Sequence, residues 1–344
     1  MSSVLVLGGT SFVGRAIVAD AVARGLDVTT LNRGSTGVDH PGVRALRADR
    51  NDPPEVAAVL RGRTFDAAID VSGLAPAQVA ATTWALRDRV GHYSLVSTVT
   101  TYADEAFDLP PDALIHEDAP TVAADPADPS PPDMARYGEQ KRGCELVLLR
   151  EFGPDAALIA RPGLILGPHE NVHRIPYWLG RAAGGGEVIG PGHPARRFQF
   201  VDVRDLAEWL VTSSLAGLAG TYNAINPPGR DTWGDWWNAC AEVTGGKAQA
   251  RWIDDQTLQD HGVEVAFGVP MWFAEDLPGF ADDRLRSTGF VARPLLETVQ
   301  ASWDWLRPLV SAPPAGYRPA PMSRDEELRI LAATAGVRPP RSGP

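Results

Sequence analysis

The chain has 344 residues, of which 44% are hydrophobic and 22% charged, and its mean hydropathy is -0.14. These values are ordinary for a globular protein with one large domain or two smaller ones. No apolar run reaches the roughly 18 residues of a membrane-spanning helix, and no basic stretch precedes the apolar run Val4–Leu7, so we expect neither a membrane span nor a signal peptide. The two cysteines, Cys144 and Cys240, cannot build a disulfide framework, which favours a cytoplasmic location.

The net charge is -11, from 43 acidic and 32 basic residues. General binding to the phosphate backbone of nucleic acids is therefore not expected. Nine of the acids lie in residues 104–135, a segment with no Lys or Arg and with seven prolines between Pro110 and Pro132. We predict an irregular acidic loop there, longer than most connections, and a solvated surface loop is its simplest interpretation.

Short apolar runs alternate with helical patterns through the first half of the chain. Strands are expected at 4–7, 28–31, 43–46, 67–71, 93–97 and 156–161, and helices from residue 12 onward, near 54–61, near 76–90 and near 136–151. Strand–helix–strand alternation with short connections predicts a parallel sheet covered by helices on both faces. The expected fold class is therefore α/β, with a doubly wound parallel sheet of the Rossmann type.

Beyond residue 165 glycines and prolines become more frequent, but one strand–helix–strand pattern returns at 198–201, 202–215 and 221–225. We therefore assign residues 1–165, together with about 198–226, to the first domain. Residues 166–197 and 227–310 are expected to form a smaller, interleaved C-terminal α/β region that binds the substrate. Residues 311–344 are expected to form a Pro-rich tail with a helix at 323–334.

A glycine turn joins the first strand to the first helix. Gly8 permits a tight turn and Gly14 lets the helix pack closely on the strand, while the helix N-terminus offers free N–H groups to a pyrophosphate. Ser11 stands where the usual spacing has a third glycine, and a merely structural turn is the alternative. Placed after the first strand of the series, the turn predicts a dinucleotide site in the first domain. Its expected cofactor contacts are Gly8, Thr10, Ser11, Phe12, Val13 and Gly14.

The end of the second strand bears on the choice of cofactor. Sheets that bind NAD usually carry an Asp or Glu here for the ribose 2′-OH, whereas a 2′-phosphate prefers a neutral residue and an Arg. Asn32 and Arg33 stand at this place, so we predict NADP(H) in preference to NAD(H), with a solvated Arg33 as the alternative. Asp49, after the third strand, is expected to approach the adenine.

Tyr137 and Lys141 stand four residues apart, and therefore on one face, of the helix expected at 136–151. A nearby cation favours a phenolate and lowers the pKa of a phenol from about 10, which suits proton exchange at neutral pH. Only two of the 32 basic residues are lysines, so such a pair is hard to obtain by accident; an ordinary helix with a surface lysine is the alternative. Ser97 and Thr98 follow the fifth strand, at the end where open α/β sheets bind ligands.

These features resemble the short-chain dehydrogenase/reductase superfamily in its extended or atypical branch, which is related to NAD-dependent epimerase/dehydratases. The resemblance runs from Val4 to about Leu306, and its further marks are Ser97-Thr98, Arg161-Pro162-Gly163, Gly167-Pro168 and the run Val201–Ala207. It implies that Tyr137 is the acid/base, that Lys141 holds the nicotinamide ribose, and that Thr98, four residues before Tyr102, holds the substrate oxygen. It also implies cofactor contacts at Ser72, Gly73, Arg161 and Pro162.

Two departures from the family bear on the reaction. Sugar-nucleotide 4,6-dehydratases follow the catalytic Thr with Asp-Glu, but Val99 and Thr100 stand here, which argues against that reaction. Sugar-nucleotide epimerases usually carry an Arg seven residues before the Asp of the Asp-Leu-Ala triplet. The residue seven before Asp205 is Phe198, and Arg197 lies one position out of register, which argues against a nucleotide-sugar substrate.

The segment His169–His173 spells the zinc-protease pattern HExxH. That chemistry needs both histidines on one face of a helix and a third ligand downstream, whereas Pro168 and Pro176 flank this segment, so we expect a coincidence and no metal. Candidate substrate contacts are Thr100, His169, Trp178 and Arg197, and core packing is the alternative for Trp178. Arginines that could anchor an anionic substrate are Arg161, Arg174, Arg196, Arg197 and Arg204, with solvated surface arginines as the alternative.

The sequence thus favours an NADP(H)-dependent reductase or dehydrogenase of a small-molecule carbonyl or alcohol, in which Tyr137 exchanges the proton of the oxygen. The alternative is an NAD(P)-dependent epimerase of a sugar or sugar nucleotide, and a third is a non-catalytic nucleotide sensor or RNA-binding relative. We expect a monomer or homodimer, with a small-molecule substrate and no nucleic-acid or membrane partner. Because residues 104–135 connect Thr98 to Tyr137, we hypothesise that this acidic segment borders or covers the site.

Overall fold

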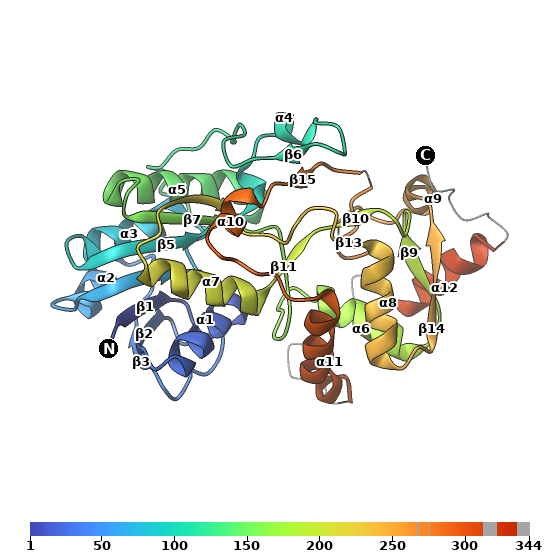
Figure 1. Cartoon of the computed structure of the whole chain (residues 1–344), viewed down its shortest axis with the longest axis horizontal. Helices are drawn as coiled ribbons and strands as arrows, with labels where there is room; N and C mark the ends of the chain where they lie inside the picture. The colour runs from blue at the N-terminus through green and yellow to red at the C-terminus, as the bar shows by residue number, and fades with distance from the viewer. Residues whose placement is uncertain (267, 275, 312–321, 336–344) are drawn as a thin grey trace.

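The computed structural model describes residues 1–266, 268–274, 276–311 and 322–335. Two lobes lie side by side, with the parallel sheet in one and a helix-rich core in the other (Figure 1). The helix expected near the C-terminus is α12 (Arg324–Ala333). The rest of the predicted Pro-rich tail, 312–321 and 336–344, lies outside the described residues.

The first lobe contains a seven-stranded parallel sheet in the order β12-β7-β5-β4-β1-β2-β3. The chain winds outward from β1 in both directions, so the strand order reverses between β1 and β4, where such sheets bind ligands at the carboxyl ends of the strands. The strands are β1 (Ser3–Leu7), β2 (Asp27–Asn32), β3 (Arg44–Arg47), β4 (Phe65–Asp70), β5 (Val90–Val96), β7 (Ala157–Arg161) and β12 (Gly220–Asn223).

Helices cover both faces of this sheet, which confirms the predicted doubly wound α/β fold (Figure 1). On one face lie α2 (Pro53–Leu60), α3 (Pro76–Leu86) and α5 (Tyr137–Phe152); on the other lie α1 (Phe12–Ala23) and α7 (Val203–Leu215). The apolar side chains of α1 and α7 meet in one core under the sheet, with Ile17 and Leu206 fully buried. Burial on both faces explains why the strands read as continuous apolar runs.

The second lobe has its own core. It is built by α6 (Arg174–Gly184), α8 (Trp233–Thr244), α11 (Leu295–Ser311) and the parallel pair β9 (Gly186–Pro191) and β14 (Ala248–Ile253), with α12 against β9. Trp178 is 1% exposed, packs on Trp233 with ring centroids 5.3 Å apart, and donates its indole N–H to the carbonyl oxygen of Pro270. The substrate contact predicted for Trp178 is therefore wrong: this side chain belongs to the core, as do Trp233, Trp236 and Trp237.

The chain crosses between the lobes several times. Residues 203–223 supply α7 and β12 to the first lobe, although segments of the second lobe precede and follow them. The short pairs β8 (Leu164–Leu166) with β11 (Phe200–Asp202), and β10 (Arg197–Phe198) with β13 (Asp231–Thr232), accompany the crossings. A further return was not predicted: α10 (Asp283–Ser287) packs on β12, and Trp209 of α7 donates its indole N–H to Thr288 Oγ1 at 2.8 Å. The range 227–310 therefore does not lie wholly in the second lobe.

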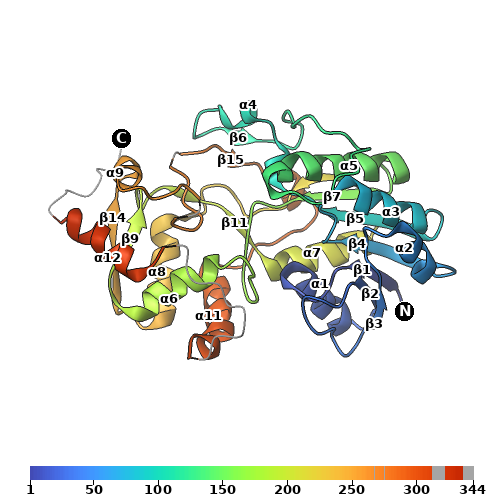
Figure 2. The same ribbon diagram turned by 180° about the vertical axis from the view of Figure 1, so that it is seen from behind.

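The acidic segment 104–135 is more structured than the irregular loop that we predicted. It contains α4 (Asp104–Phe107) and β6 (Leu114–Ile115), which pairs with β15 (Gly279–Phe280) far along the chain. Glu117 is buried, and its carboxylate accepts a hydrogen bond from the backbone N–H of Asn223 in β12 at 3.0 Å. The segment runs along one side of the molecule, beside α5 and β15 (Figure 2). The segment is ordered by contacts with distant parts of the chain, such as β15 and β12, which its composition does not predict.

Among the helices that the structure describes, none is long and apolar enough to cross a membrane. Cys144 and Cys240 are buried free thiols. The cytoplasmic location and the monomeric or dimeric state stay predictions.

Candidate active site

The glycine turn between β1 and α1 leaves no room for side chains. Gly8 and Gly9 adopt φ angles of 115° and 108°, which glycine reaches without strain. A Cβ on Gly14 would lie 2.6 Å from the backbone nitrogen of Gly9 and 3.0 Å from Val71 Cγ2. Helix α1 therefore approaches the turn as closely as backbones allow, as the sequence predicts.

The first turn of α1 is open to a ligand. Ser11 stands at the N-cap but makes no side-chain cap, so its hydroxyl does not occupy the first N–H groups of the helix. Ser11 Oγ instead accepts a hydrogen bond from Asn171 Nδ2 of the second lobe at 3.0 Å, and Thr10 Oγ1 bonds Thr36 Oγ1 at 2.8 Å. An uncapped helix N-terminus on a glycine turn fits the pyrophosphate of a dinucleotide. Phe12 and Val13, expected contacts as well, form its first two residues.

The end of β2 holds a carboxylate that the sequence reasoning missed. Asn32 Nδ2 donates to Asp39 Oδ1 at 3.0 Å, and Arg47 of β3 pairs with the same carboxylate. Arg33 is exposed and makes no hydrogen bond or ion pair with the residues that the structure describes. The absence of a carboxylate, which was the premise for NADP(H), therefore does not hold here. Asp39 follows Asn32 by seven positions, in a loop whose course no local pattern indicates.

The carboxyl ends of β1, β3 and β4 are tied by a buried ion pair. Arg50 Nη2 lies 2.6 Å from Asp70 Oδ2, with both side chains buried. Although burial opposes it, the charge and hydrogen bonds of Arg50 hold the pKa of Asp70 below its usual value. Arg50 also donates to Ser72 Oγ at 3.0 Å, and Ser72 Oγ donates to the carbonyl oxygen of Leu7 at 3.0 Å. This pair keeps the strand ends together where a dinucleotide would lie. Asp49, nearby, accepts from Asn51 at 2.9 Å.

The predicted catalytic residues lie on α5 and after β5. Lys141 is 2% exposed, and its Nζ donates to the carbonyl oxygens of Gly73 at 2.6 Å and Val96 at 2.7 Å. Two carbonyls at the ends of β4 and β5 thus hold the ammonium, and Gly73 contributes through its backbone. Tyr137 begins α5 one turn earlier and is half-buried.

The hydroxyls after β5 lie against the start of α5. Thr98 Oγ1 accepts from the Thr100 backbone N–H and bonds Thr100 Oγ1, each at 3.2 Å, in the short turn η1 (Val99–Thr101). A Cβ on Gly138 would clash with the carbonyl oxygen of Thr100, so only glycine lets α5 start this close. The start of α5, where Tyr137 stands, therefore lies against the turn that carries Thr98 and Thr100.

Three neighbouring side chains support these residues instead of facing a ligand. Ser97 Oγ and Arg161 Nε donate to Glu145 Oε1 at 2.5 and 2.9 Å, and Arg161 Nη2 donates to Glu145 Oε2 at 2.7 Å. Although burial opposes it, Arg161 lowers the pKa of the Glu145 carboxyl. Tyr102 is buried under the Arg161 guanidinium and donates to Asn223 Oδ1 at 2.6 Å. The cofactor contact expected of Arg161 is thus not supported, since its side chain is buried and paired with Glu145. The carbonyl oxygen of Pro162 accepts a hydrogen bond from the Val99 N–H at 3.1 Å.

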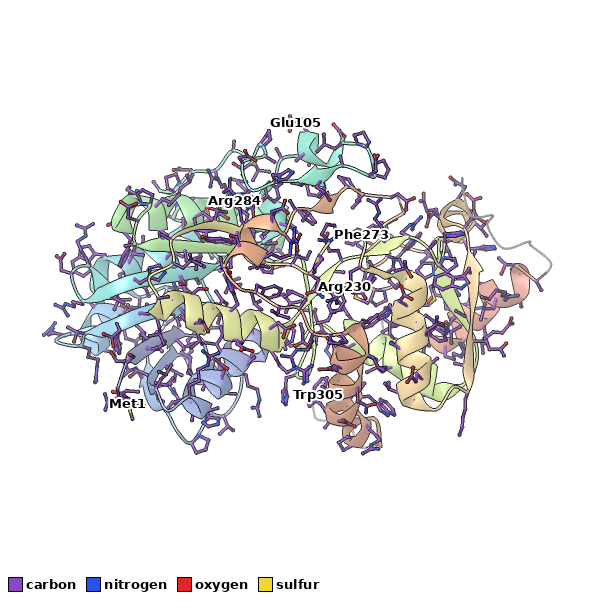
Figure 3. The ribbon with its side chains drawn as sticks, viewed as in Figure 1. Met1, Glu105, Arg230, Phe273, Arg284 and Trp305 are labelled. Atoms are coloured by element: carbon purple, nitrogen blue, oxygen red, sulfur yellow. The ribbon has the colours of Figure 1, made fainter. Side chains whose placement is uncertain are left out.

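The HExxH segment forms a loop that ends at α6. Glu170 accepts from the backbone N–H groups of Val172 at 3.0 Å and Arg174 at 2.9 Å, so its carboxylate caps the helix. His169 packs against Trp305 of α11 with ring centroids 5.3 Å apart and ring planes at 54°, and Trp305 lies at the junction of the lobes (Figure 3). His169 and His173 lie before the first residue of α6 and not on one face of a helix, and no cluster of three potential metal ligands occurs among the described residues; the absence of a metal stays a prediction.

Of the five arginines considered as anchors for an anion, four have strong partners. Arg161 binds Glu145, Arg196 binds Asp255 and Asp276, Arg204 binds Asp202, and Arg197 donates to the Pro111 carbonyl oxygen at 2.9 Å. Arg174, the first residue of α6, is half-buried, and its guanidinium makes no hydrogen bond or ion pair within the described part of the chain. Burial lowers the pKa of Arg174, although the charge of Glu170 opposes this.

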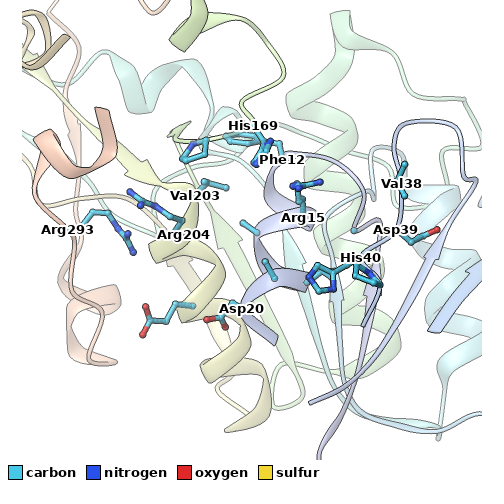
Figure 4. Close-up of a pocket in the computed structure, with 17 residues that line it drawn as sticks. Phe12, Arg15, Asp20, Val38, Asp39, His40, His169, Val203, Arg204 and Arg293 are labelled. Carbon is cyan, nitrogen blue, oxygen red and sulfur yellow. The ribbon is translucent and has the colours of Figure 1, made fainter. Parts of the chain in front are cut away.

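A cavity of about 730 Å³ runs along the outer side of α1. Its lining includes Gly9, Phe12, Arg15, Asp39 and His169 (Figure 4). The cavity therefore connects the glycine turn to the carboxylate at the end of β2, and Tyr137 is not among its lining residues.

A doubly wound sheet with a glycine turn after β1 and a Tyr–Lys pair on α5 defines the extended class of short-chain dehydrogenases/reductases. The model of the NAD dependent epimerase/dehydratase family matches residues 4–224, and the chain belongs to this family. The comparisons support the epimerase/dehydratase class better than the carbonyl reductase that the sequence first favoured.

Individual relatives are distant. The chain is 29% identical over 184 residues to the dTDP-6-deoxy-L-talose 4-dehydrogenase (NAD(P)(+)) of Kitasatospora kifunensis, a match that covers 50% of this chain and 55% of that protein. The chain thus spans about half the length of this curated relative. Two solved structures share its fold: WbmH of Bordetella bronchiseptica with NAD+ (18% identity, TM-score 0.65, 89% and 98% of the chains) and UDP-glucose 4-epimerase of Thermus thermophilus with NAD (21% identity, TM-score 0.64, 89% and 99%).

Proposed function

We propose that this protein is a nicotinamide-dependent epimerase of a sugar or sugar nucleotide. The observation that carries the proposal is that the start of α5, where Tyr137 stands, lies against the turn of Thr98 and Thr100, with Lys141 buried one helical turn further on, at the carboxyl end of the sheet that also carries the glycine turn. The nicotinamide ring, when bound, supplies a reversible hydride acceptor. The family to which the chain belongs, and the names of the solved structures that share its fold, favour this reaction class over reduction of a simple carbonyl.

The side chains of the site divide the remaining tasks. Thr98 Oγ1 and Thr100 Oγ1 are hydroxyls that can hydrogen-bond the reacting oxygen of the sugar. Tyr137 takes the hydroxyl proton when the carbon is oxidised and returns it when the carbon is reduced. Lys141, fixed by two carbonyl oxygens, keeps a positive charge at the strand ends, where it can hold the nicotinamide ribose.

Arg174 is suited to bind the anionic part of the substrate. It begins α6 in the second lobe, and within the described residues it is the one considered arginine whose guanidinium makes no hydrogen bond or ion pair. A phosphate accepts two parallel hydrogen bonds from a guanidinium, which orients the substrate as well as attracting it. This supports a sugar nucleotide among the possible substrates, even though Phe198, 4% exposed in the core, occupies the register where epimerases usually carry an Arg.

Three other functions can be compared with the residues of the site and with the relatives of the chain. Val99 offers no acid or base where dehydratases carry an Asp, so elimination of water is disfavoured. A reductase of a keto sugar is the second candidate, since the relative from Kitasatospora kifunensis is described as a 4-dehydrogenase. A nucleotide sensor is disfavoured because Tyr137 and Lys141 are both present.

The test is a panel of UDP- and dTDP-hexoses incubated with catalytic amounts of NAD+ or NADP+, with the products analysed by NMR. An epimerase gives a mixture of two epimers with no lasting change in nicotinamide absorbance, whereas a simple dehydrogenase reduces one NAD(P)+ for each hexose oxidised and stops when the cofactor is used up. Tyr137→Phe is expected to abolish turnover. Tyr222→Phe, whose hydroxyl donates to the Ala219 carbonyl at 2.9 Å, is the matched control and should keep it. Full turnover of Tyr137→Phe, or stoichiometric cofactor consumption, contradicts the proposal.

A further inference from the structure

The loop of residues 167–173 belongs to the second lobe but contacts the glycine turn of the first. It joins β8 to α6, and Asn171 Nδ2 donates to Ser11 Oγ at 3.0 Å. Ser11 directly precedes α1, at a position where the usual spacing has a glycine and therefore no side chain that could accept this bond. The serine thus creates a side-chain contact between the lobes at the α1 N-terminus.

The rest of this loop is attached to the second lobe. His169 packs against Trp305 of α11 with ring centroids 5.3 Å apart. The Glu170 carboxylate accepts from the backbone N–H groups of Val172 and Arg174, where α6 begins. Because both attachments belong to the second lobe, the bond from Asn171 to Ser11 ties that lobe to the glycine turn.

The backbone is strained on both sides of this contact. His169 and His173 adopt φ angles of 67° and 65°, and Phe12, next to Ser11, adopts a φ of 31°. Residues other than glycine rarely occupy this left-handed region, and such conformations persist where the surrounding structure holds them, often at ligand clamps and switches. Of the six non-glycine residues with positive φ in the described part of the chain, half lie at this contact. Strain in the closed loop favours a second, open arrangement.

The contact lies beside the expected position of a pyrophosphate. Phe12 of α1 and His169 of the loop line the same cavity of about 730 Å³ (Figure 4). Ser11 Oγ does not cap α1, and while it accepts from Asn171 its own O–H can still donate to a phosphate oxygen. A phosphate on the first N–H groups of α1 would extend a chain of hydrogen bonds from Asn171 through Ser11 to the cofactor, and the bonds of such a chain strengthen one another.

We propose that the loop of residues 167–173 is a gating loop for the dinucleotide, held closed by the hydrogen bond between Asn171 and Ser11. The bond is present in the closed arrangement, so it breaks before the cofactor enters and again before it leaves. Bound pyrophosphate strengthens the bond through Ser11 and thereby slows release. The proposal rests on the proposed function only for dinucleotide binding and not for any particular reaction.

The test is the kinetics of NADH and NADPH binding to the full-length protein, without any sugar substrate. Stopped-flow nicotinamide fluorescence gives the association rate constant, and displacement of the bound cofactor by excess NAD+ or NADP+ gives the dissociation rate constant. Asn171→Ala removes the bond that holds the loop closed, so both rate constants should rise by about fivefold, the factor expected for one hydrogen bond between neutral groups. In a Ser11→Ala background, where the acceptor is already absent, Asn171→Ala should have no further effect.

Asn238→Ala is the matched control. Asn238 is an exposed asparagine of α8 in the second lobe, without a side-chain hydrogen bond among the described residues, and its substitution should leave both rate constants unchanged. A general loss of folding would weaken binding and could not speed association.

Three results would overturn the gating loop. They are unchanged rate constants in Asn171→Ala, the same effect of Asn171→Ala with and without Ser11, and a rise of the dissociation rate constant alone, which would make Asn171 a direct ligand of the cofactor. Any of these beside normal epimerisation would leave the proposed function intact. The expected kinetics without epimerisation by the wild type would refute the proposed function alone, and a wild type that binds neither dinucleotide would refute both.

Discussion

The close packing of α1 on the glycine turn predicts the effect of adding one methyl group. A Cβ on Gly14 would lie 2.6 Å from the Gly9 nitrogen, 3.0 Å from the Gly9 Cα and 3.0 Å from Val71 Cγ2. Two of these atoms are backbone atoms of the turn and cannot rotate away, so in Gly14→Ala helix α1 must move off β1. Overpacking of this kind costs about 1–3 kcal/mol. Alanine recovers about 1 kcal/mol of helix propensity, which leaves a net loss of up to about 2 kcal/mol.

A matched glycine separates the clash from helix propensity. Gly180 lies inside α6, and a Cβ added there would meet no atom within 4 Å, so Gly180→Ala should stabilise the protein by about 0.5–1 kcal/mol. Unfolding in urea, followed by tryptophan fluorescence, gives the free energy of unfolding of each variant. Titration with NADH gives their cofactor affinities, which are expected to differ as well. Because the proposed pyrophosphate site lies at the start of α1, Gly14→Ala should bind NADH at least about tenfold more weakly, while Gly180→Ala should bind it normally. A Gly14→Ala protein as stable as Gly180→Ala, with unchanged NADH affinity, would refute the reasoning.

Two further predictions concern buried ionisable groups. Glu145→Gln removes the partner of the buried Arg161 and should lower the free energy of unfolding by about 3–5 kcal/mol. The control Glu139→Gln, in the first turn of the same helix, should leave the free energy of unfolding unchanged. Equal unfolding midpoints of the two variants in urea would contradict the role of the pair. Burial lowers the pKa of His92 from 6.5, so below that pH the unfolded chain binds a proton more readily than the folded one and stability is lost as the pH falls. In His92→Leu this loss should be smaller between pH 7 and 5, and identical pH profiles of the unfolding midpoint would exclude His92 as its source.

The sheet and the glycine turn were predictable because their signals are local. Most strands are short runs of β-branched or apolar residues, and β1, β2, β4 and β12 end at or directly before Gly, Asn or Asp. Alternation with helices predicts their parallel pairing, whereas the order of the seven strands comes from the structure. The role of Gly14 follows from spacing alone, since any residue at that position of such a turn faces the backbone of the turn. The pairing of Tyr137 with Lys141 on one helix face is local in the same sense.

The contacts of Asp39, Arg161 and Arg174 were not predictable, because they depend on which residues the tertiary structure brings near these side chains. Nothing in the run from Asn32 to Asp39 shows that the loop folds back so that the Asn32 amide can donate a hydrogen bond to the Asp39 carboxylate. In so Arg-rich a chain, arginines with a charged partner cannot be told from those without one until the carboxylates are placed. Arg161 and Arg174 cannot be told apart in the sequence, yet Arg161 is paired with Glu145, whereas the Arg174 guanidinium makes no hydrogen bond or ion pair within the described residues.

The acidic segment 104–135 shows how composition and structure can point to different roles. Its nine carboxylates suggested a solvated cover over the site, but the segment is bonded to the elements that carry the reacting groups. The Val122 N–H donates to the carbonyl oxygen of Thr101 at 3.0 Å, and a Cβ on Gly143 of α5 would lie 3.1 Å from the carbonyl oxygen of Asp125. At its other end Pro111 accepts from Arg197 of the second lobe. The segment therefore borders the site as a brace between η1, α5 and the second lobe, and its removal would disturb the positions of Thr98 and Tyr137 together with any effect on substrate entry.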